Sequence, residues 1–244
     1  NKILLSFMVA YPVISYFLLL GGLGILPIVE TYKLGGLMLT LIIASFGIII
    51  SFPIGILLAL GRQSELSTVR FFSVMYIEFI RAVPLITILF MASNVLPLFF
   101  DSGISMDKLV RALIAITLFQ AAYMAEVVRG GLQAIPKGQY EAADAIGLSY
   151  YQKNILIILP QALKISIPNI VGSSISLFKD TTLVLIIGLM DFLAVVTGAA
   201  ADKEWLGRHL EGYVFVAMVL WVMLYTMSRY SKKLELRFNT ENTN

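Results

Sequence analysis

The stretch LGGLMLTLIIASFGIIISFPIGILLALG, residues 34–61, carries no charged side chain at any position. A helix needs about 20 predominantly apolar residues to cross the hydrocarbon core of a bilayer, so this stretch is long enough to span it. The whole chain has the same character, because 59% of its 244 residues are hydrophobic and only 14% are charged. Soluble domains average about 25% charged residues, so the composition excludes a soluble domain and indicates an integral membrane protein.

Five further stretches are apolar enough to cross the membrane, which predicts an all-α, polytopic helical bundle with about six spans. They are residues 3–29, 82–100, 109–128, 155–178 and 212–227. In the fourth span we expect Arg111 and Glu126 to lie near the two interfaces, where long side chains reach the headgroups. The apolar stretch 183–201 is left open between a further crossing and a re-entrant or half-crossing helix buried in protein.

The distribution of positive charge predicts the orientation. With six spans, both termini lie on the same side of the membrane. Most of the 18 Lys and Arg residues fall on that side, including Arg229, Lys232 and Lys233 after the last span. Loops rich in Lys and Arg are usually cytoplasmic, so we expect both termini in the cytoplasm. Residues 3–20 are longer than the apolar region of a typical signal peptide, so no cleaved secretory signal is predicted.

The composition also excludes several kinds of chemistry. The chain has no cysteine and a single histidine, His209, so we expect neither disulfides nor a multi-histidine metal site. No Gly-Lys dipeptide occurs, so the phosphate-binding loop of ATPases is absent and the chain is not expected to hydrolyse ATP. A net charge of +3 is too small to indicate a nucleic-acid partner. We therefore predict no catalytic residue, no metal and no cofactor on this chain, which is not expected to be an enzyme.

The loop between the fourth and fifth spans, residues 129–154, is predicted to fold as two short helices. Pro136 suits the start of a helix, and Gly147 suits a left-handed residue that ends it. Ser149 with Gln152 three residues later is a capping-box pattern, which starts a second helix that runs into the fifth span.

The tip of this loop is the strongest candidate for a contact with another protein. It carries Glu141, Ala142 and Ala143, followed by Gly147. The two alanines allow a partner to approach closely, and the carboxylate offers a charge-assisted anchor. A solvated connector with alanine and glycine by chance is the alternative interpretation.

Polar residues recur at helical spacing along the fifth span, namely Asn169, Ser173, Ser176 and Asp180. This spacing places them on one face of a helix. Such a face either makes hydrogen bonds to other helices or lines a water-filled translocation path. Lys179, Thr181 and Thr182 lie where this helix ends, and Lys179 could contact a substrate carboxylate or pair with a nearby aspartate.

Two further patterns predict packing rather than transport chemistry. Small residues fall four apart on the second span, at Gly47, Ser51, Gly55 and Ala59, which is typical of close helix contacts in membranes. Glu78 and Arg81 are three residues apart and share a helix face, so we predict a structural ion pair between them.

The loop motif resembles that of a known family. Glu141-Ala142-Ala143, three residues, Gly147, nine residues and Ile157-x-Leu159-Pro160 resemble the EAA signature of ATP-binding-cassette importer permeases. Residues 123–139, residues 177–184 and Glu78-Phe-Ile-Arg-Ala-Val-Pro-Leu resemble the polar amino-acid subgroup, with Ala82 where glycine is usual. From residue 33 onward the chain is similar in particular to the larger permeases of general L-amino-acid transporters.

This resemblance implies the transmembrane domain of a type I importer over residues 33–231, with an N-terminal span and outer loop at 1–32 and a cytoplasmic tail at 232–244. It implies that Glu141 to Gly147 form a coupling helix that docks on an ATPase. The implied partners are two ATP-binding subunits that hold ATP and Mg²⁺, a second homologous permease as a heterodimer, a periplasmic amino-acid-binding protein, an amino-acid substrate and the bacterial inner membrane.

The alternative function is an ion-coupled secondary amino-acid transporter. That class couples energy within one fold, typically through internal repeats with broken helices. The sequence shows no convincing repeat, and the long loop at 129–154 would have no role.

Overall fold

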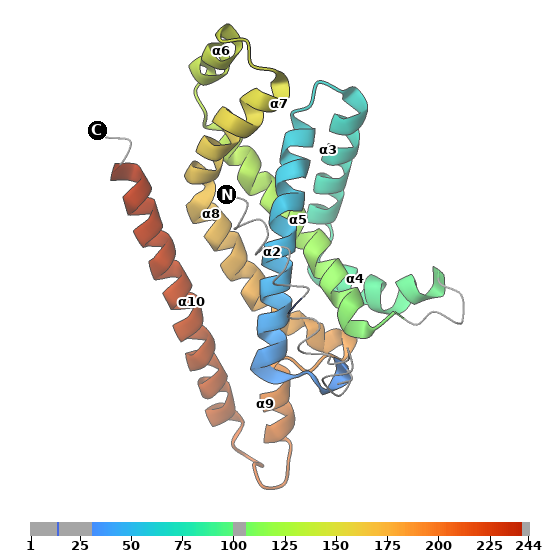
Figure 1. The fold of residues 1–244 in the computed structure, drawn as a ribbon. Coiled ribbons are helices and arrows are strands. Elements are labelled where there is room, and N and C mark those ends of the chain that lie inside the picture. Colours follow the sequence, from blue (N-terminus) through green and yellow to red (C-terminus); the bar gives the residue numbers. More distant parts are fainter. Residues whose placement is uncertain (1–13, 15–30, 100–105, 241–244) are drawn as a thin grey trace. The chain divides into compact units, whose positions relative to one another are not determined.

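The structure is a computed structural model that describes residue 14, residues 31–99 and residues 106–240, with side chains described up to residue 236. These residues fold into helices joined by short turns (Figure 1). They cluster into two compact units, each made of three separate stretches of chain. The first unit comprises the described residues within 1–51, 83–120 and 177–219, and the second comprises those within 52–82, 121–176 and 220–244. The predicted first span, 3–29, lies outside the described residues.

Four helical runs among the described residues are long and apolar enough to cross a membrane. They are α2 (Gly36–Arg62), α5 (Lys108–Gln133), the run of α7 (Tyr150–Gln152), η4 (Lys153–Ile158), α8 (Leu159–Asp180) and η5 (Thr181–Ile187), and α10 (His209–Thr240). These runs contain the predicted second, fourth, fifth and sixth spans, and they confirm the membrane helical bundle.

The third predicted span, 82–100, begins at a sharp bend. The chain forms α3 (Ser67–Ala82), α4 (Leu85–Phe90), the π-helical turn η2 (Met91–Val95) and the 3-10 turn η3 (Leu96–Phe99), with a bend of 101° between α3 and the rest. Pro84 explains the break, because it lacks a backbone N–H and disfavours a helical conformation at Val83. Together the two arms are apolar enough to count as one broken span.

The stretch left open, 183–201, consists of the end of η5, a turn and α9 (Phe192–Ala200). Gly188 ends η5 with a φ of 77°, a left-handed conformation that suits glycine. A helix of nine residues is about 13 Å long, less than half the bilayer core, so α9 cannot cross alone. The Asp191 carboxylate caps α9 by accepting hydrogen bonds from two backbone N–H groups.

The core of the second unit forms where the small-residue face of α2 meets α5. Its buried members are Ala59, Ile77, Ala125, Val128, Leu132, Ile135, Ile158 and Ala162. A Cβ added at Gly55 would lie 2.7 Å from the Met124 Cβ, closer than real side chains approach. Ser51 and Ala59 are fully buried, so the predicted close-packing face of α2 is confirmed.

Candidate functional site

The loop that follows α5 has the predicted helix, turn, helix form. Its first helix, α6 (Lys137–Ala145), begins directly after Pro136, and Gly147 has a φ of 74°. The capping box is present: the Ser149 hydroxyl accepts from the backbone N–H of Gln152, and the Gln152 side chain accepts from the Ser149 N–H. Figure 1 shows α6 and α7 together beyond the end of α5. The local sequence therefore determines this shape.

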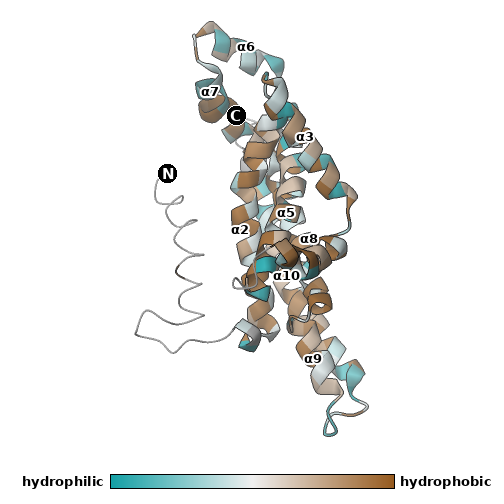
Figure 2. Cartoon of the chain, turned by 90° about the vertical axis from the view of Figure 1, so that its right-hand side faces the viewer, coloured by the Kyte–Doolittle hydropathy of each residue, from teal (hydrophilic) through white to brown (hydrophobic). Residues whose placement is uncertain are grey.

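The exposed surface of α6 differs in part from the predicted tip. Glu141 and Ala142 are exposed, but Ala143 is 1% exposed and faces the protein, because residues two apart on a helix point in different directions. Ile146, which the sequence analysis did not single out, is 71% exposed. Figure 2 shows hydrophilic residues gathered on α6. Ile146, directly after α6, is an exposed apolar side chain.

Three side-chain contacts hold α6 against its neighbours. The Tyr140 hydroxyl donates to the Leu132 carbonyl at the end of α5, over 3.3 Å. Lys153 in η4 pairs with Asp144 over 2.6 Å. Gln161 at the start of α8 donates to Gln139 over 3.1 Å. These contacts connect α6 to α5, η4 and α8.

The Tyr140 contact does not depend on pH near neutrality. Burial raises the pKa of the Tyr140 phenol above its ordinary value. The hydroxyl therefore keeps its proton, and it remains a hydrogen-bond donor to Leu132.

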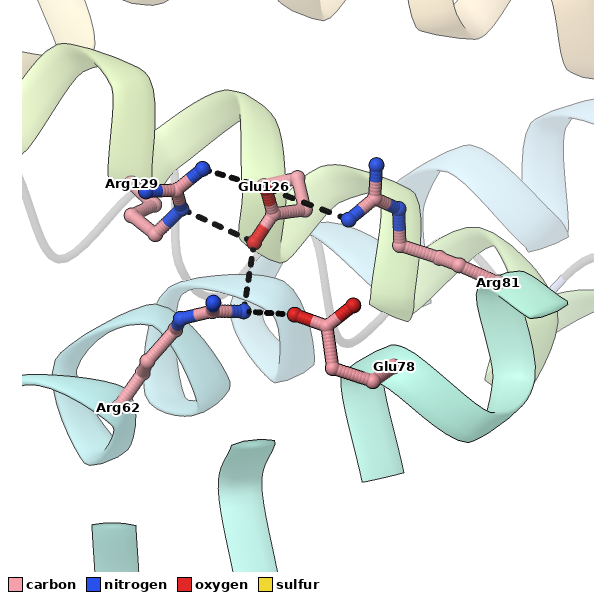
Figure 3. A network of polar contacts seen from close by, with 5 residues as sticks. All are labelled: Arg62, Glu78, Arg81, Glu126 and Arg129. Atoms are coloured by element: carbon pink, nitrogen blue, oxygen red, sulfur yellow. Dashed lines mark hydrogen bonds and ion pairs between the residues drawn. The ribbon is translucent and has the colours of Figure 1, made fainter. Parts of the chain in front are cut away.

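A second polar cluster, which we call the Glu126 hub, lies on the last turns of α5 (Figure 3). Three arginines meet its carboxylate: Arg62 at 2.9 Å, Arg81 at 3.3 Å and Arg129 at 2.8 Å. Arg129 contacts both carboxylate oxygens, a bidentate geometry that strengthens the pair. The Glu126 side chain is only 15% exposed, so little water screens these contacts.

The predicted ion pair between Glu78 and Arg81 is wrong. Glu78 instead accepts from Arg62 over 2.7 Å, and Arg81 reaches Glu126. Within the described part of the chain the two are not paired with each other, although both belong to the hub (Figure 3). Glu78 and Arg81 each pair with a side chain on another helix, α2 or α5, instead of with each other. Their spacing along α3 could not reveal these partners.

The hub ties together the ends of three helices. Arg62 is the last residue of α2, Arg81 is next to last in α3, and Glu126 and Arg129 lie on α5. The loop 129–154, which we call the coupling loop, begins at Arg129 itself. The sequence analysis missed this cluster as a unit, and the only local signal was the three-residue spacing of Glu126 and Arg129.

The residues of the predicted polar face of α8 differ in exposure. Asn169 and Ser176 are exposed, Ser173 and Asp180 are half-buried, and Lys179 is exposed. Gly172 extends the exposed stripe, because a Cβ added there would meet no atom within 4 Å. The stripe therefore leaves polar side chains and the Gly172 backbone exposed on a membrane helix.

The two threonines after α8 do not extend this stripe equally. Thr181 is fully buried, and its hydroxyl donates to the Phe178 carbonyl over 2.8 Å. Thr182 is half-buried and donates to the Lys179 carbonyl over 3.0 Å. Thr181 therefore has a packing role in this chain rather than an exposed position. Among the described residues, no group of three or more His, Cys, Asp or Glu side chains could hold a metal ion.

The chain belongs to the family of binding-protein-dependent transport system inner membrane components, whose model matches residues 51–239. The match covers α3 to α10 and includes both the coupling loop and the Glu126 hub. The earlier resemblance to importer permeases is thereby confirmed at the level of the family.

Two similar proteins of this family are amino-acid permeases. The inner membrane amino-acid ABC transporter permease protein YhdY of Escherichia coli strain K12 is 56% identical over 100% of this chain and 66% of its own length. The glutamate/glutamine/aspartate/asparagine transport system permease protein BztC of Rhodobacter capsulatus is 52% identical over 88% of this chain and 50% of its own length. This chain thus spans about half to two thirds of these two relatives.

Solved structures agree on the fold. A chain from the crystal structure of an amino acid ABC transporter with histidines is 29% identical, with a TM-score of 0.73 over 83% of this chain and 92% of its own. A chain of the MetNI methionine ABC transporter, in an inward-facing conformation, has a TM-score of 0.60 at 20% identity over 80% of this chain and 91% of its own.

Proposed function

We propose that this chain is the membrane-spanning subunit of an ATP-driven amino-acid importer and forms half of its translocation pathway. Amino-acid permease relatives at 56% and 52% identity support the substrate class. The family description supports dependence on an external binding protein. The chain itself carries no ATP site in this proposal, because ATP and Mg²⁺ are held by two separate ATP-binding subunits.

The single observation that carries the proposal is the construction of α6. It exposes Glu141, Ala142 and Ile146, while Tyr140 and Asp144 fasten it to α5 and η4. An exposed helix with short side chains, held firmly from behind, suits docking in a groove of a partner. A solvated connector would need no such fastening.

The remaining partners and the orientation are part of the same proposal, and the family match supports them. α6 meets an ATPase in the cytoplasm, so the C-terminal end of α10 also lies on the cytoplasmic side of the bacterial inner membrane. A second homologous permease completes the pathway as a heterodimer, and a periplasmic binding protein delivers the amino acid from outside. Both termini of this chain are cytoplasmic.

Coupling proceeds through the fastened loop. Closure of the ATPase subunits moves α6, and the contacts at Leu132 and Gln161 pass this motion to α5 and α8. The Glu126 hub keeps the ends of α2 and α3 attached to α5 as it moves. The exposed stripe Asn169, Gly172, Ser176 and Lys179 on α8 then lines the path, with Ser173, Asp180 and Thr182 at its edge.

Replacing Glu141 by arginine tests the docking surface. The variant Glu141→Arg places a long cation on the exposed face of α6, so the complex is expected to lose at least about tenfold of its ATP-driven uptake, equivalent to about 1.4 kcal/mol of coupling. Uptake and ATP hydrolysis are measured together in proteoliposomes that contain the whole complex. The matched control is Glu65→Arg, which makes the same change at an exposed residue of the turn between α2 and α3 and should leave uptake unchanged.

The energy source separates this proposal from secondary transport. An importer requires ATP on the side of the ATPase subunits and a binding protein on the other side. Uptake driven by a proton or sodium gradient alone, with neither ATP nor a binding protein, would favour the secondary transporter. Normal uptake by Glu141→Arg would remove the docking role of α6 without affecting the substrate class.

A further inference from the structure

The second half of α10 carries an aromatic and basic face that the chain leaves uncovered. Trp221 and Tyr225 stack with ring centres 5.0 Å apart, and the Arg229 guanidinium lies 5.9 Å from the centre of the Tyr225 ring. Lys233 follows one turn later on the same face. All four side chains are exposed. The contact between the Arg229 cation and the Tyr225 ring stabilises their arrangement on this face.

This order matches the layers of a membrane surface. Residues 212–227 carry no charge, and their helical length of about 24 Å nearly fills one hydrocarbon core. Tyr225 then lies toward one interface, where aromatic side chains with a polar edge are favoured, and Trp221 lies one turn closer to the middle of the stretch. Arg229 and Lys233 come next and lie at the depth of the lipid headgroups.

The positive charge at this depth is unbalanced. Arg229, Lys232 and Lys233 have no carboxylate partner among the described residues. Glu235 is the nearest acidic residue along the helix, so the segment 229–236 carries a net charge of +2. Pairing within the described part of the chain therefore does not satisfy these cations.

A groove runs along the same residues and gives a ligand room to bind. Its volume is about 520 Å³, and its lining includes Thr226, Arg229, Tyr230, Lys232, Lys233 and Leu236. The lining combines cations, two hydroxyl groups and an exposed leucine. A phosphodiester with attached acyl chains fits this face better than a free anion, because the Tyr225 and Trp221 rings offer an apolar surface on the membrane side of the cations.

We propose that this face of α10 binds the headgroup of an anionic glycerophospholipid. Arg229, Lys232 and Lys233 contact the phosphate, and the Thr226 and Tyr230 hydroxyls donate hydrogen bonds to its oxygens or to the glycerol. The acyl chains run along Tyr225 and Trp221 toward the membrane centre. Each cation at an anionic membrane surface contributes about fivefold to binding.

The test uses the whole transporter complex, purified in detergent and equilibrated with micelles that contain equal parts of phosphatidylglycerol and phosphatidylcholine. After washing, the lipids retained per complex are counted by mass spectrometry. The complex with the natural sequence should retain phosphatidylglycerol in preference to phosphatidylcholine. The double variant Arg229→Gln with Lys233→Gln should bind phosphatidylglycerol about 20- to 30-fold more weakly, as two lost cations predict.

Two matched variants control for charge and for folding. Lys203→Gln with Arg208→Gln removes the same pair of residue types from the turn before α10, where Asp202, Glu204 and Glu211 already balance them, and should retain the lipid. Arg229→Lys with Lys233→Arg keeps both charges and should also retain it. A loss in the glutamine variant alone therefore reports the site itself.

Three outcomes would overturn the proposal. Equal retention by the glutamine variant would show that these cations do not bind lipid. Displacement of phosphatidylglycerol by millimolar inorganic phosphate would show a free-anion site. Binding that appears only after the ATPase subunits are removed would show that a protein partner, rather than lipid, covers this face.

Discussion

Helices α5 and α10 are both long enough to cross a membrane, yet they have opposite surroundings. By the mean hydropathy of its most apolar window, α10 is the more apolar of the two. Nevertheless 61% of the α5 window is buried within the chain, against 6% for α10. Hydropathy therefore does not decide which membrane helix lies inside.

Side-chain size explains the difference. The buried side of α5 is rich in small residues, among them Ala112, Ala115, Ala121, Ala122, Ala125 and Gly131. α10 instead exposes large residues such as Met218, Trp221 and Tyr225. Lipid is as apolar as leucine, so helices gain little by hiding large apolar side chains and associate where small residues allow close contact.

The largest expected effect comes from removing the charge at the centre of the hub on α5. Glu126→Gln leaves Arg62, Arg81 and Arg129 facing one another, which should cost about 2 to 4 kcal/mol of unfolding free energy, slightly below the range for fully buried pairs. The measurement is denaturant unfolding of the complex in detergent. Glu78→Gln is the control, because its side chain is 54% exposed and its pair should be worth about 1 kcal/mol or less.

A smaller loss is expected from one added methyl group on α5. A Cβ at Gly131 would clash with the Ser166 Oγ and the Ala162 carbonyl oxygen, so Gly131→Ala should cost about 1 to 3 kcal/mol. Gly130 is its matched neighbour, with no atom within 4 Å of an added Cβ. Gly130→Ala should stabilise the helix by about 0.5 to 1 kcal/mol.

Thermal inactivation of ATP-driven uptake would distinguish these two variants. Gly131→Ala should lower both stability and transport, because α8 must move away from α5 near the coupling loop. If the two glycine variants behaved alike, the contact between α5 and α8 in the second unit would lose its support.

The smallest effects should come from one identical deletion in both helices. Val128 on α5 is fully buried, whereas Val222 on α10 is 55% exposed. Val128→Ala leaves a cavity and should cost about 1 kcal/mol, while Val222→Ala should change stability by less than about 0.5 kcal/mol. Unfolding in detergent measures both. A large cost at Val222 in the whole complex, but not in the isolated chain, would identify a partner subunit rather than lipid on α10.

Local patterns predicted the coupling loop well because each of its signals acts over a few residues. Pro136, Gly147 and the Ser149 capping box each satisfy or remove backbone hydrogen bonds nearby, so the structure places all three as expected. The bend before α4 was missed, although Pro84 was its local signal. Hydropathy across 82–100 outweighed that proline in the prediction.

Contacts between distant residues could not be predicted in the same way. Glu78 and Arg81 share a helix face, yet each pairs with a side chain from another helix. Ala143 belongs to the EAA motif and is nevertheless buried, because the direction that α6 faces depends on the contacts of Tyr140 and Asp144. The roles of Glu141 and of the α8 stripe in coupling and transport stay predictions.

The sequence alone determined the class of protein and the position of the loop, residues 129–154, that carries the EAA motif. Long uncharged stretches require helices in a bilayer, and the spacing of the EAA motif identified the importer permeases. Only the tertiary structure decided which charges meet and which helices are covered. The ion pairs and the burial of helices both depend on side chains from segments far apart in the sequence. The pattern within one segment carries no information about these contacts.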